Sequence, residues 1–473
     1  MLLDLSGELL EEIGTNLIQT DRANLRAVCK NLGGPVDRLF FSVLVLKTGH
    51  QLTSGNGVEI LRALATGETK WSLYAKALRI SPGKQARNQE TKEIHINISD
   101  NELQDLLASA LKSMPKIRTV AWDVHEQACS EWERDTICDF LNILVALKEL
   151  ELNIQGNIDF SQLSIRGIRK FTLKTPKLWR SLLRLSPSSG PPLMYQQIPQ
   201  LVPQNRITSL HLEGGNQWSQ VWTMLRRTHE STSRIKLSDI ITSVVTPELF
   251  DHLTSYSGLE RLTLKFPDGG SRDVSDRLAD TFFETVLPHH AASLTELSCP
   301  AAYESRFSFG EHNVGVVSLL HNLTSLEMSV NAGAVRKADP PPDGTRIRLV
   351  SIGVSVTAEQ SDIDPVVTLL LQTIASLPAL RSLAVVSAET ERNRGAWCGN
   401  GRIHHKGAVD VAIANAVKTF RSNVPCSAIV RAGYQTYELH PISTHNPERE
   451  GLGGELGMLG YQQMGSVLSK WRR

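Results

Sequence analysis

Apolar residues recur along most of the chain in one short pattern: an apolar residue, two variable residues, an apolar residue, one variable residue and a last apolar residue. Such alternation is typical of a β-strand with one buried face. The clearest copies are LKELEL from Leu147, IRKFTL from Ile168, ITSLHL from Ile207, LERLTL from Leu259, LTELSC from Leu294, LTSLEM from Leu323 and LRSLAV from Leu380. Less regular strands are expected at SVLVL from Ser42, ALRIS from Ala77, IHINIS from Ile94, IRTVAWDV from Ile117, RIKLSD from Arg234 and LVSIGVSV from Leu349.

Segments with helical periodicity separate many of these strands and end near a proline or a glycine. We expect helices over 101–113, 131–145, 216–227, 273–286 and 362–377, and a helix start at Thr246-Pro247-Glu248. Strands and helices alternate at a spacing of roughly 20 to 40 residues, which predicts an α/β fold with a parallel sheet backed by helices. A doubly wound α/β domain is the structural alternative, and the repeated pattern favours a solenoid.

Four further segments depart from the alternation. Two proline-rich stretches, 186–206 and 336–346, are expected to be exposed loops. Residues 408–420 are predicted to form a capping helix that closes the array. The segment from 441 to 473 is rich in glycine and polar residues, so we expect it to be poorly ordered.

The first thirty residues have a different pattern, with two short amphipathic helices side by side. Ser6 can cap the first helix, in which Leu9, Ile13 and Leu17 recur every four residues. Thr20 can cap the second helix, which we expect to end at Gly33-Gly34-Pro35. Its apolar residues, at the spacing i, i+3, i+4 and i+7, are Leu25, Val28, Cys29 and Leu32.

The combined spacing of these residues resembles the F-box, the motif that binds the Skp-type linker in Skp–cullin–F-box ubiquitin ligases. The residues that carry the resemblance are Leu5, Glu8, Leu9, Leu10, Ile13, Leu17, Asp21, Leu25, Arg26, Val28, Cys29, Lys30 and Leu32. Ser6 and Arg22 depart from the family, which usually has proline and often has leucine at these positions. The resemblance implies that six residues lie in the small core of the motif or against the linker: Leu5, Leu9, Ile13, Leu17, Val28 and Cys29. The alternative is an ordinary helical hairpin that caps the domain after it.

The repeats that follow are similar to a leucine-rich-repeat solenoid, which F-box proteins of the fungal kind often carry. We therefore expect an α/β protein with an N-terminal F-box helical motif over 1–45. An irregular leucine-rich-repeat solenoid with an inner parallel sheet and outer helices would span 46–390, and a capping segment with a partly flexible tail 391–473.

Composition excludes several classes of function. Lys and Arg number 50 against 49 Asp and Glu, so no global charge attracts nucleic acid or a membrane surface. No apolar run approaches the ~18 residues of a membrane span, and the N-terminus lacks a positive leader region, which favours the cytoplasm or the nucleus. Six scattered cysteines without a CxxC pair argue against disulfides and thiolate metal sites.

If the repeats form an inner sheet, the variable residues beside the middle leucine of each repeat point to its open face. We expect a protein target to bind there, through Glu149, Glu151, Lys170, His211, Arg261, Glu296 and Glu327. Charges of alternating sign suit a protein better than a phosphate backbone. The alternative is a solvated sheet face that simply carries mixed charge.

The densest group of candidate catalytic or metal-binding residues is His404-His405, near Cys398, His440 and His445. It has no metal-ligand spacing, so neither a metal nor another cofactor is expected. The F-box resemblance implies a non-enzymatic, substrate-recognition adaptor that binds a Skp-type linker, through it a cullin, and a protein target. Two alternatives remain: a repeat scaffold whose N-terminal hairpin is a cap, and an α/β enzyme with its site near Cys398 and His405.

Overall fold

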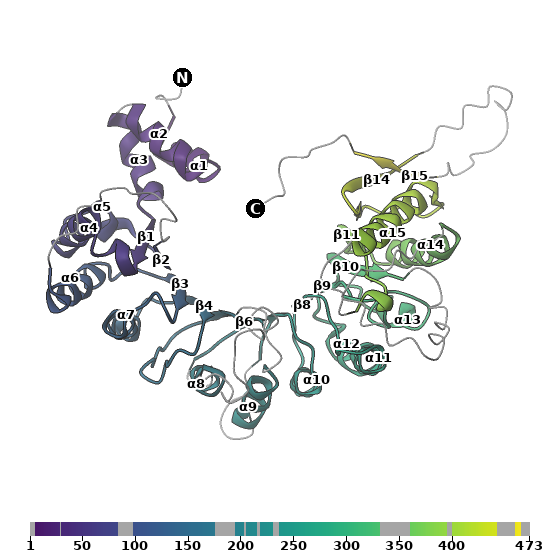
Figure 1. Cartoon of the computed structure of the whole chain (residues 1–473). Helices are drawn as coiled ribbons and strands as arrows, with labels where there is room; N and C mark the ends of the chain where they lie inside the picture. The colour runs from purple at the N-terminus through teal and green to yellow at the C-terminus, as the bar shows by residue number, and fades with distance from the viewer. Residues whose placement is uncertain are drawn as a thin grey trace. The chain divides into compact units, whose positions relative to one another are not determined.

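The protein is a mixed α/β structure with a large, mostly parallel sheet and helices, compatible with a solenoid-like repeat (Figure 1). The computed structural model describes residues 5–28, 30–83, 98–175, 194–202, 205–214, 218–229, 236–331, 360–394, 400–441 and 459–464. The chain divides into two compact units, Met1–Ile235 and Lys236–Arg473.

In the described part of the first unit, six parallel strands form the sheet, each paired with the next along the chain. They are β1 (Val43–Thr48), β2 (Ala77–Pro82), β3 (Thr119–His125), β4 (Glu149–Gln155), β5 (Lys170–Lys174) and β6 (Ser209–Glu213). The register places the middle apolar residue of one repeat beside that of the next, as in the pairing of Leu150 with Phe171 and of Phe171 with Leu210. The expected parallel sheet is thereby confirmed.

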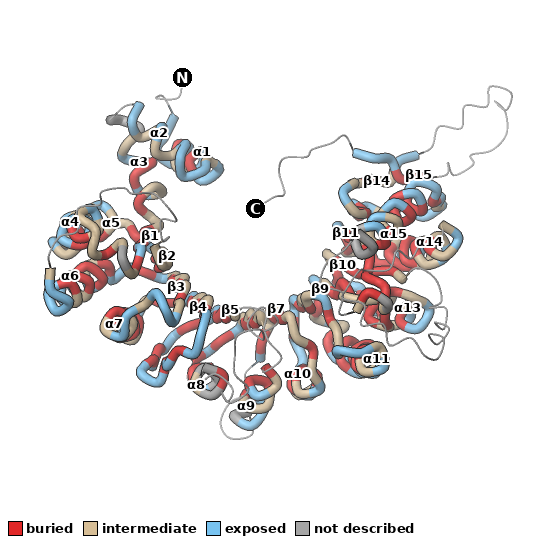
Figure 2. Tube along the Cα trace, in the orientation of Figure 1, coloured by how far each residue is buried: buried red, intermediate tan, exposed pale blue. Residues whose placement is uncertain are grey.

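Helices cover one side of these strands (Figure 1). They are α4 (Gly55–Ala65), α5 (Lys70–Tyr74), α6 (Asp100–Lys112), α7 (Glu131–Ile143), α8 (Met194–Leu201) and α9 (Ser219–His229), with a short 3-10 turn at Gly49–Gln51. Alternate residues of these strands are buried, as expected where one face of a sheet packs against helices. Figure 2 marks the buried residues of the chain in red. Trp218, just before α9, and Trp222 within it are fully buried.

The second unit repeats this arrangement with β7 (Asp239–Thr242), β8 (Arg261–Leu264), β9 (Glu296–Cys299), β10 (Ser325–Val330), β11 (Ser382–Ser387) and β13 (Ile429–Ala432). In this part of the chain β7 pairs with β8, β8 with β9, β9 with β10, β10 with β11 and β11 with β13, each time in parallel. Its helices are α10 (Pro247–Leu253), α11 (Arg272–Thr281), α12 (Leu287–His290), α13 (Val314–Val317), α14 (Gln360–Ala375) and α15 (Asn400–Thr419). A π-helical turn at Phe282–Val286 joins α11 to α12, and a 3-10 turn lies at Glu391–Asn393.

Antiparallel strands end the sheet of the second unit. After β13 come β14 (Gln435–Pro441), β15 (Leu459–Gln463) and the two-residue β12 (Arg421–Ser422). Because β15 belongs to the segment expected to be poorly ordered, that expectation is wrong for 459–463. Burial explains the difference, since Tyr461 is buried and its ring lies 6.1 Å from that of Phe420.

Five other expectations need correction or lie outside the described residues. The loop predicted over 186–206 contains α8, because Tyr195 is buried against Trp218 with ring centroids 4.8 Å apart. The strand expected from Arg234 begins only at Asp239. Most of the strand from Ile94, the strand from Leu349 and the loop over 336–346 lie outside the described residues.

Candidate functional site

Three short helices precede the first strand: α1 (Gly7–Thr15), α2 (Gln19–Val28) and α3 (Lys30–Phe40). The predicted cap of α1 is present, since the Leu9 amide donates to Ser6 Oγ at 3.4 Å. The predicted Thr20 cap is wrong, because α2 already begins at Gln19. Arg22 ties the two helices together by donating to the carbonyls of Gly14 (2.8 Å) and Thr15 (3.0 Å) at the C-terminal end of α1.

The glycines and proline at 33–35 do not end a helix, contrary to the prediction, because α3 runs through them to Phe40. An interior proline costs a helix about 3 kcal/mol, so other contacts must hold α3 together. Val36 is fully buried, and Asp37 is buried beside Arg26 of α2 and Lys70 of α5. Tertiary packing thus overrides the local signal.

The α1 helix has two apolar faces. Leu10 and Gly14 are buried, and a Cβ on Gly14 would come within 2.7 Å of Leu39 Cδ1 of α3, so this face packs on the rest of the unit. On the other face Leu9 and Ile13 lie one turn apart and are exposed by 48% and 39%, and Leu5, which precedes the capping Ser6, is exposed by 36%. We call these three residues the α1 stripe. Packing within the chain leaves it open to solvent.

The other candidate linker-binding residues occupy different environments. Leu17 is half-buried in the turn between α1 and α2, and Val28 at the end of α2 is 72% exposed. Cys29 lies outside the described residues. Sequence reasoning missed Ile18, which is exposed by 42% in the same turn as Leu17; its position next to a periodic leucine was the only available signal.

Asp37 anchors these helices to the repeat array. Its carboxylate accepts from Arg26 Nε at 2.5 Å and from Lys70 Nζ, while the Arg26 guanidinium lies 4.4 Å from the centre of the Phe40 ring. Burial by itself would raise the pKa of Asp37, but the hydrogen bonds from Lys70 and Arg26 outweigh it and hold this pKa below its ordinary value.

Asp37→Asn is expected to lower the free energy of unfolding of the N-terminal helices by about 1–2 kcal/mol. The effect is no larger because Lys70 is half exposed, so solvent screens its attraction to Asp37. Since the folded-state pKa lies below the unfolded value, this contribution is present at neutral pH and disappears as the pH falls below about 4. Amide hydrogen exchange of α1–α3 measures it. The exposed Asp139→Asn on α7 is the matched control, and equal protection in both variants would contradict the anchoring role.

In the first unit the predicted target-binding residues lie on neighbouring strands, on the face that alternates with the buried one. Glu149 pairs in register with Lys170, and Glu151 and His211 both neighbour Thr172, which is buried despite its outward position. Several charges on this face are satisfied locally. Glu151 accepts from Lys174 Nζ at 2.7 Å, and His211 Nε2 lies 2.5 Å from Glu213 Oε1.

In the second unit Arg261 pairs in register with Glu296, and Glu327 of β10 pairs in register with Ser298, two residues after Glu296. Arg261 also donates to Asp239 at 3.1 Å, which raises its pKa. Glu327 accepts from Ser298 Oγ at 2.7 Å and from Arg431 at 3.3 Å. The structure brings the candidate residues of each unit together on one polar sheet face.

The candidate catalytic group is not assembled in the described part of the chain. His404 is exposed on α15, whereas His405 is fully buried with Nε2 3.3 Å from Glu304 Oε1; Cys398 lies outside the described residues. Neighbouring residues of a helix point in different directions, so the two histidines do not converge. Among the described residues there is no cluster of three or more His, Cys, Asp or Glu side chains suited to a metal ion.

None of the helices in the described ranges is both long and apolar enough to cross a membrane. No protein-family model matches the sequence, and no curated protein matches it. Among solved structures, a crystal structure of a Rad7 and Elc1 complex in yeast is similar to this chain at 13% sequence identity and a TM-score of 0.37. The match covers 81% of this chain and 88% of that one. A likeness this distant carries no conclusion about what the present chain binds.

Proposed function

We propose that this protein is a substrate-recognition adaptor of a Skp–cullin–F-box ubiquitin ligase, and that it docks on a Skp-type linker through the α1 stripe. One observation carries the proposal. Leu5, Leu9 and Ile13 match the linker-binding spacing of the F-box and are exposed in the folded chain.

A simple cap would use the apolar residues of its helices to cover the core. Here Leu10 and Gly14 already supply that packing. The side chains of the α1 stripe stay exposed and are not needed to cover the core. Covering a leucine or isoleucine side chain fully is worth about 1.5–3 kcal/mol, and roughly half of that remains available at each position of the stripe. Three such residues on one face form a plausible central anchor for a partner.

The same proposal gives the polar sheet face to a protein target and assigns no bond chemistry to the chain. Holding a target beside the ligase raises the effective concentration of its lysines near the ubiquitin-loaded enzyme. The mixed charges around Glu149 and Lys170, and around Arg261 and Glu296, favour a polar protein surface over a phosphate backbone.

The test is calorimetric binding of purified Skp-type linker to the full chain and to Leu9→Asp and Ile13→Asp. We expect binding of the wild type and at least a ~100-fold loss in each variant, because an aspartate would be buried without a partner in the complex. Circular dichroism should show unchanged folding, since both side chains are exposed in the free chain.

Ile60→Asp on α4 is the matched control, because Ile60 is also an exposed apolar residue of the first unit. It should bind the linker like the wild type. Leu10→Asp should unfold the helices, since Leu10 is buried. A folded wild type that does not bind the linker would contradict the adaptor role and leave a repeat scaffold with a helical cap.

A further inference from the structure

A row of basic residues lies at the edge of the first sheet where its strands begin. Lys76, Arg118, Lys148 and Arg169 each directly precede one of four successive strands, β2 to β5, and all four are exposed. Backbone bonds keep them in register: the amides of Arg118, Lys148 and Arg169 donate to the carbonyls of Lys76 (2.7 Å), Arg118 (2.8 Å) and Lys148 (2.8 Å). Adjacent strands are about 4.8 Å apart, so four positive charges follow one another closely. We call this row the basic ladder.

The ladder is not neutralised within the part of the chain that the structure describes, where none of its four side chains has a hydrogen bond or an ion pair. The acidic residue nearest to the ladder is Glu149, which follows Lys148 in the sequence and lies beside Lys170 in the strand register. On the sheet face, by contrast, Glu151 is held by Lys174. Like charges on neighbouring strands destabilise a sheet. The ladder therefore lowers the stability of the folded chain, and folding alone does not explain its presence.

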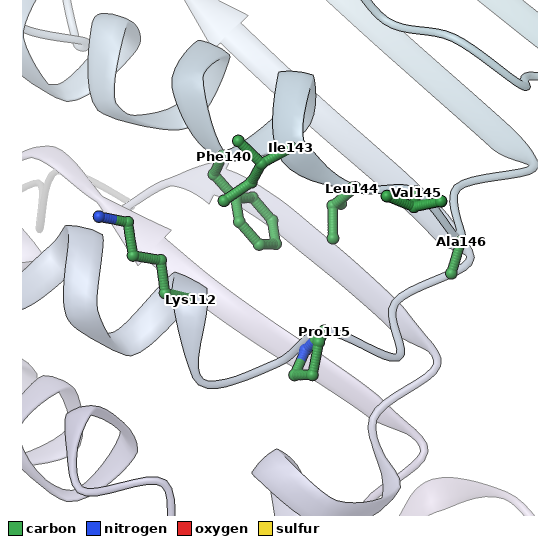
Figure 3. Close-up of a pocket in the computed structure, with 7 residues that line it drawn as sticks. All are labelled: Lys112, Pro115, Phe140, Ile143, Leu144, Val145 and Ala146. Atoms are coloured by element: carbon green, nitrogen blue, oxygen red, sulfur yellow. The ribbon is translucent and has the colours of Figure 1, made fainter.

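An apolar hollow of about 320 Å³ opens between the two loops that lead into the middle of the ladder (Figure 3). The α6–β3 loop contributes Pro115, three residues before Arg118, and the α7–β4 loop contributes Val145, three residues before Lys148. The lining residues are Lys112, Pro115, Phe140, Ile143, Leu144, Val145 and Ala146. Ile143 and Val145 are exposed by 55% and 89%, which is high for aliphatic side chains beside a ready-made hollow.

We propose that the basic ladder and this hollow together bind an acidic peptide segment that carries one aliphatic anchor residue. Carboxylates of the peptide would pair with Arg118 and Lys148, and the anchor would cover Val145 in the hollow. Charge complementarity identifies the partner as acidic, and the aliphatic lining favours a peptide side chain over a nucleotide base. Stacking on a base needs an exposed aromatic ring, and the phenylalanine of the hollow, Phe140, is buried.

This surface is distinct in sequence from the α1 stripe, so it stands whether or not the chain binds a linker. The probe is a fluorescein-labelled, glutamate-rich peptide with one central leucine, titrated with the full chain and followed by fluorescence anisotropy. We expect saturable binding that weakens with added salt. Arg118→Glu/Lys148→Glu should lower the affinity at least ~10-fold, because it replaces attraction by repulsion.

Two comparisons separate the charge from the anchor. Val145→Ser should weaken binding of the leucine peptide but not of the same peptide with serine in place of leucine. Arg227→Glu/Arg277→Glu makes the same change in net charge at exposed positions away from the ladder and should bind like the wild type. Circular dichroism and linker binding should be unchanged in all variants, which separates this surface from the α1 stripe.

Three results would overturn the proposal. They are no binding of the peptide by the folded wild type, equal affinity of the Arg118→Glu/Lys148→Glu variant, and tighter binding of a single-stranded oligonucleotide than of the peptide. The last result would assign the ladder to nucleic acid instead.

Discussion

Trp122→Ala is expected to lower the free energy of unfolding of the first unit by ~3–5 kcal/mol. Trp122 is among the largest fully buried side chains, at the middle of β3. Its strand neighbours in register are Ile80 and Leu152, and its ring meets that of Phe160 edge to face with centroids 6.0 Å apart. Alanine would leave a cavity among rigid strands that cannot close around it, so both the transfer energy and the packing contacts are lost.

Urea unfolding followed by circular dichroism measures this effect, with Val145→Ala as the control. Val145 is 89% exposed, so its truncation should change stability by less than about 0.5 kcal/mol. If Trp122→Ala unfolded at the same urea concentration as the control, the strand would not be part of a tightly packed core. In a repeat structure each repeat is stabilised by its neighbours, so a large loss of stability at β3 should also weaken the adjoining strands.

The repeats could be predicted because burial leaves a periodic signature in the sequence. Each of the seven clearest repeats became a parallel strand, and the register aligns their middle apolar residues, such as Leu262 with Leu297. The helices between them were predicted to within a few residues because proline and glycine mark their ends. The structure adds that the helix expected over 273–286 continues through a π-helical turn into α12.

Tertiary contacts account for the predictions that failed. Local signals placed a break at Gly33-Gly34-Pro35 and a loop around Tyr195, yet both segments are helical where distant residues bury them. The N-terminal docking face was partly predictable, since spacing selects Leu5, Leu9 and Ile13. Spacing could not tell that Leu10 rather than Leu9 packs inward, because both lie within an apolar run and only the position of α3 decides.

The basic ladder leaves a pattern in the sequence, although no site was predicted from it. Lys148, Arg118 and Arg169 occupy the same place in their repeats, the first variable position after the leading apolar residue. Aligning the repeats reveals three basic residues in a column, but only the sheet register shows that they are neighbours in space. Charges that look scattered in the sequence are concentrated by parallel pairing.

Acid is expected to destabilise the second unit through His290. This histidine is buried at the end of α12; its Nε2 lies 3.0 Å from the Leu253 carbonyl, and the Leu259 amide donates to its Nδ1 at 3.4 Å. A ring that donates from Nε2 and accepts at Nδ1 must be neutral. Burial lowers the pKa of His290 from 6.5 to about 4, although the bond to Leu253 favours the charged form.

The direction in which stability changes with pH follows from this lowered pKa. Above pH 6.5 His290 is neutral in both the folded and the unfolded chain, and its contribution to stability is complete. Between 6.5 and about 4 the unfolded chain takes up the proton and the folded chain does not, so stability falls with pH. At ~1.4 kcal/mol for each pH unit, the loss reaches about 3 kcal/mol near pH 4 as an upper limit.

Urea unfolding of wild type, His290→Gln and His289→Gln between about pH 7 and pH 4 tests this. His290→Gln should be less stable than wild type at neutral pH, because a buried hydrogen bond is lost, yet its stability should fall less with acid. His289 is exposed beside it and serves as the control, which should follow the wild-type curve. Parallel curves for all three proteins would mean that His290 takes up a proton as readily in the folded chain as in the unfolded chain. Such a result would require α12 to move away from the turn that precedes β8, since the amide cannot donate to a protonated ring.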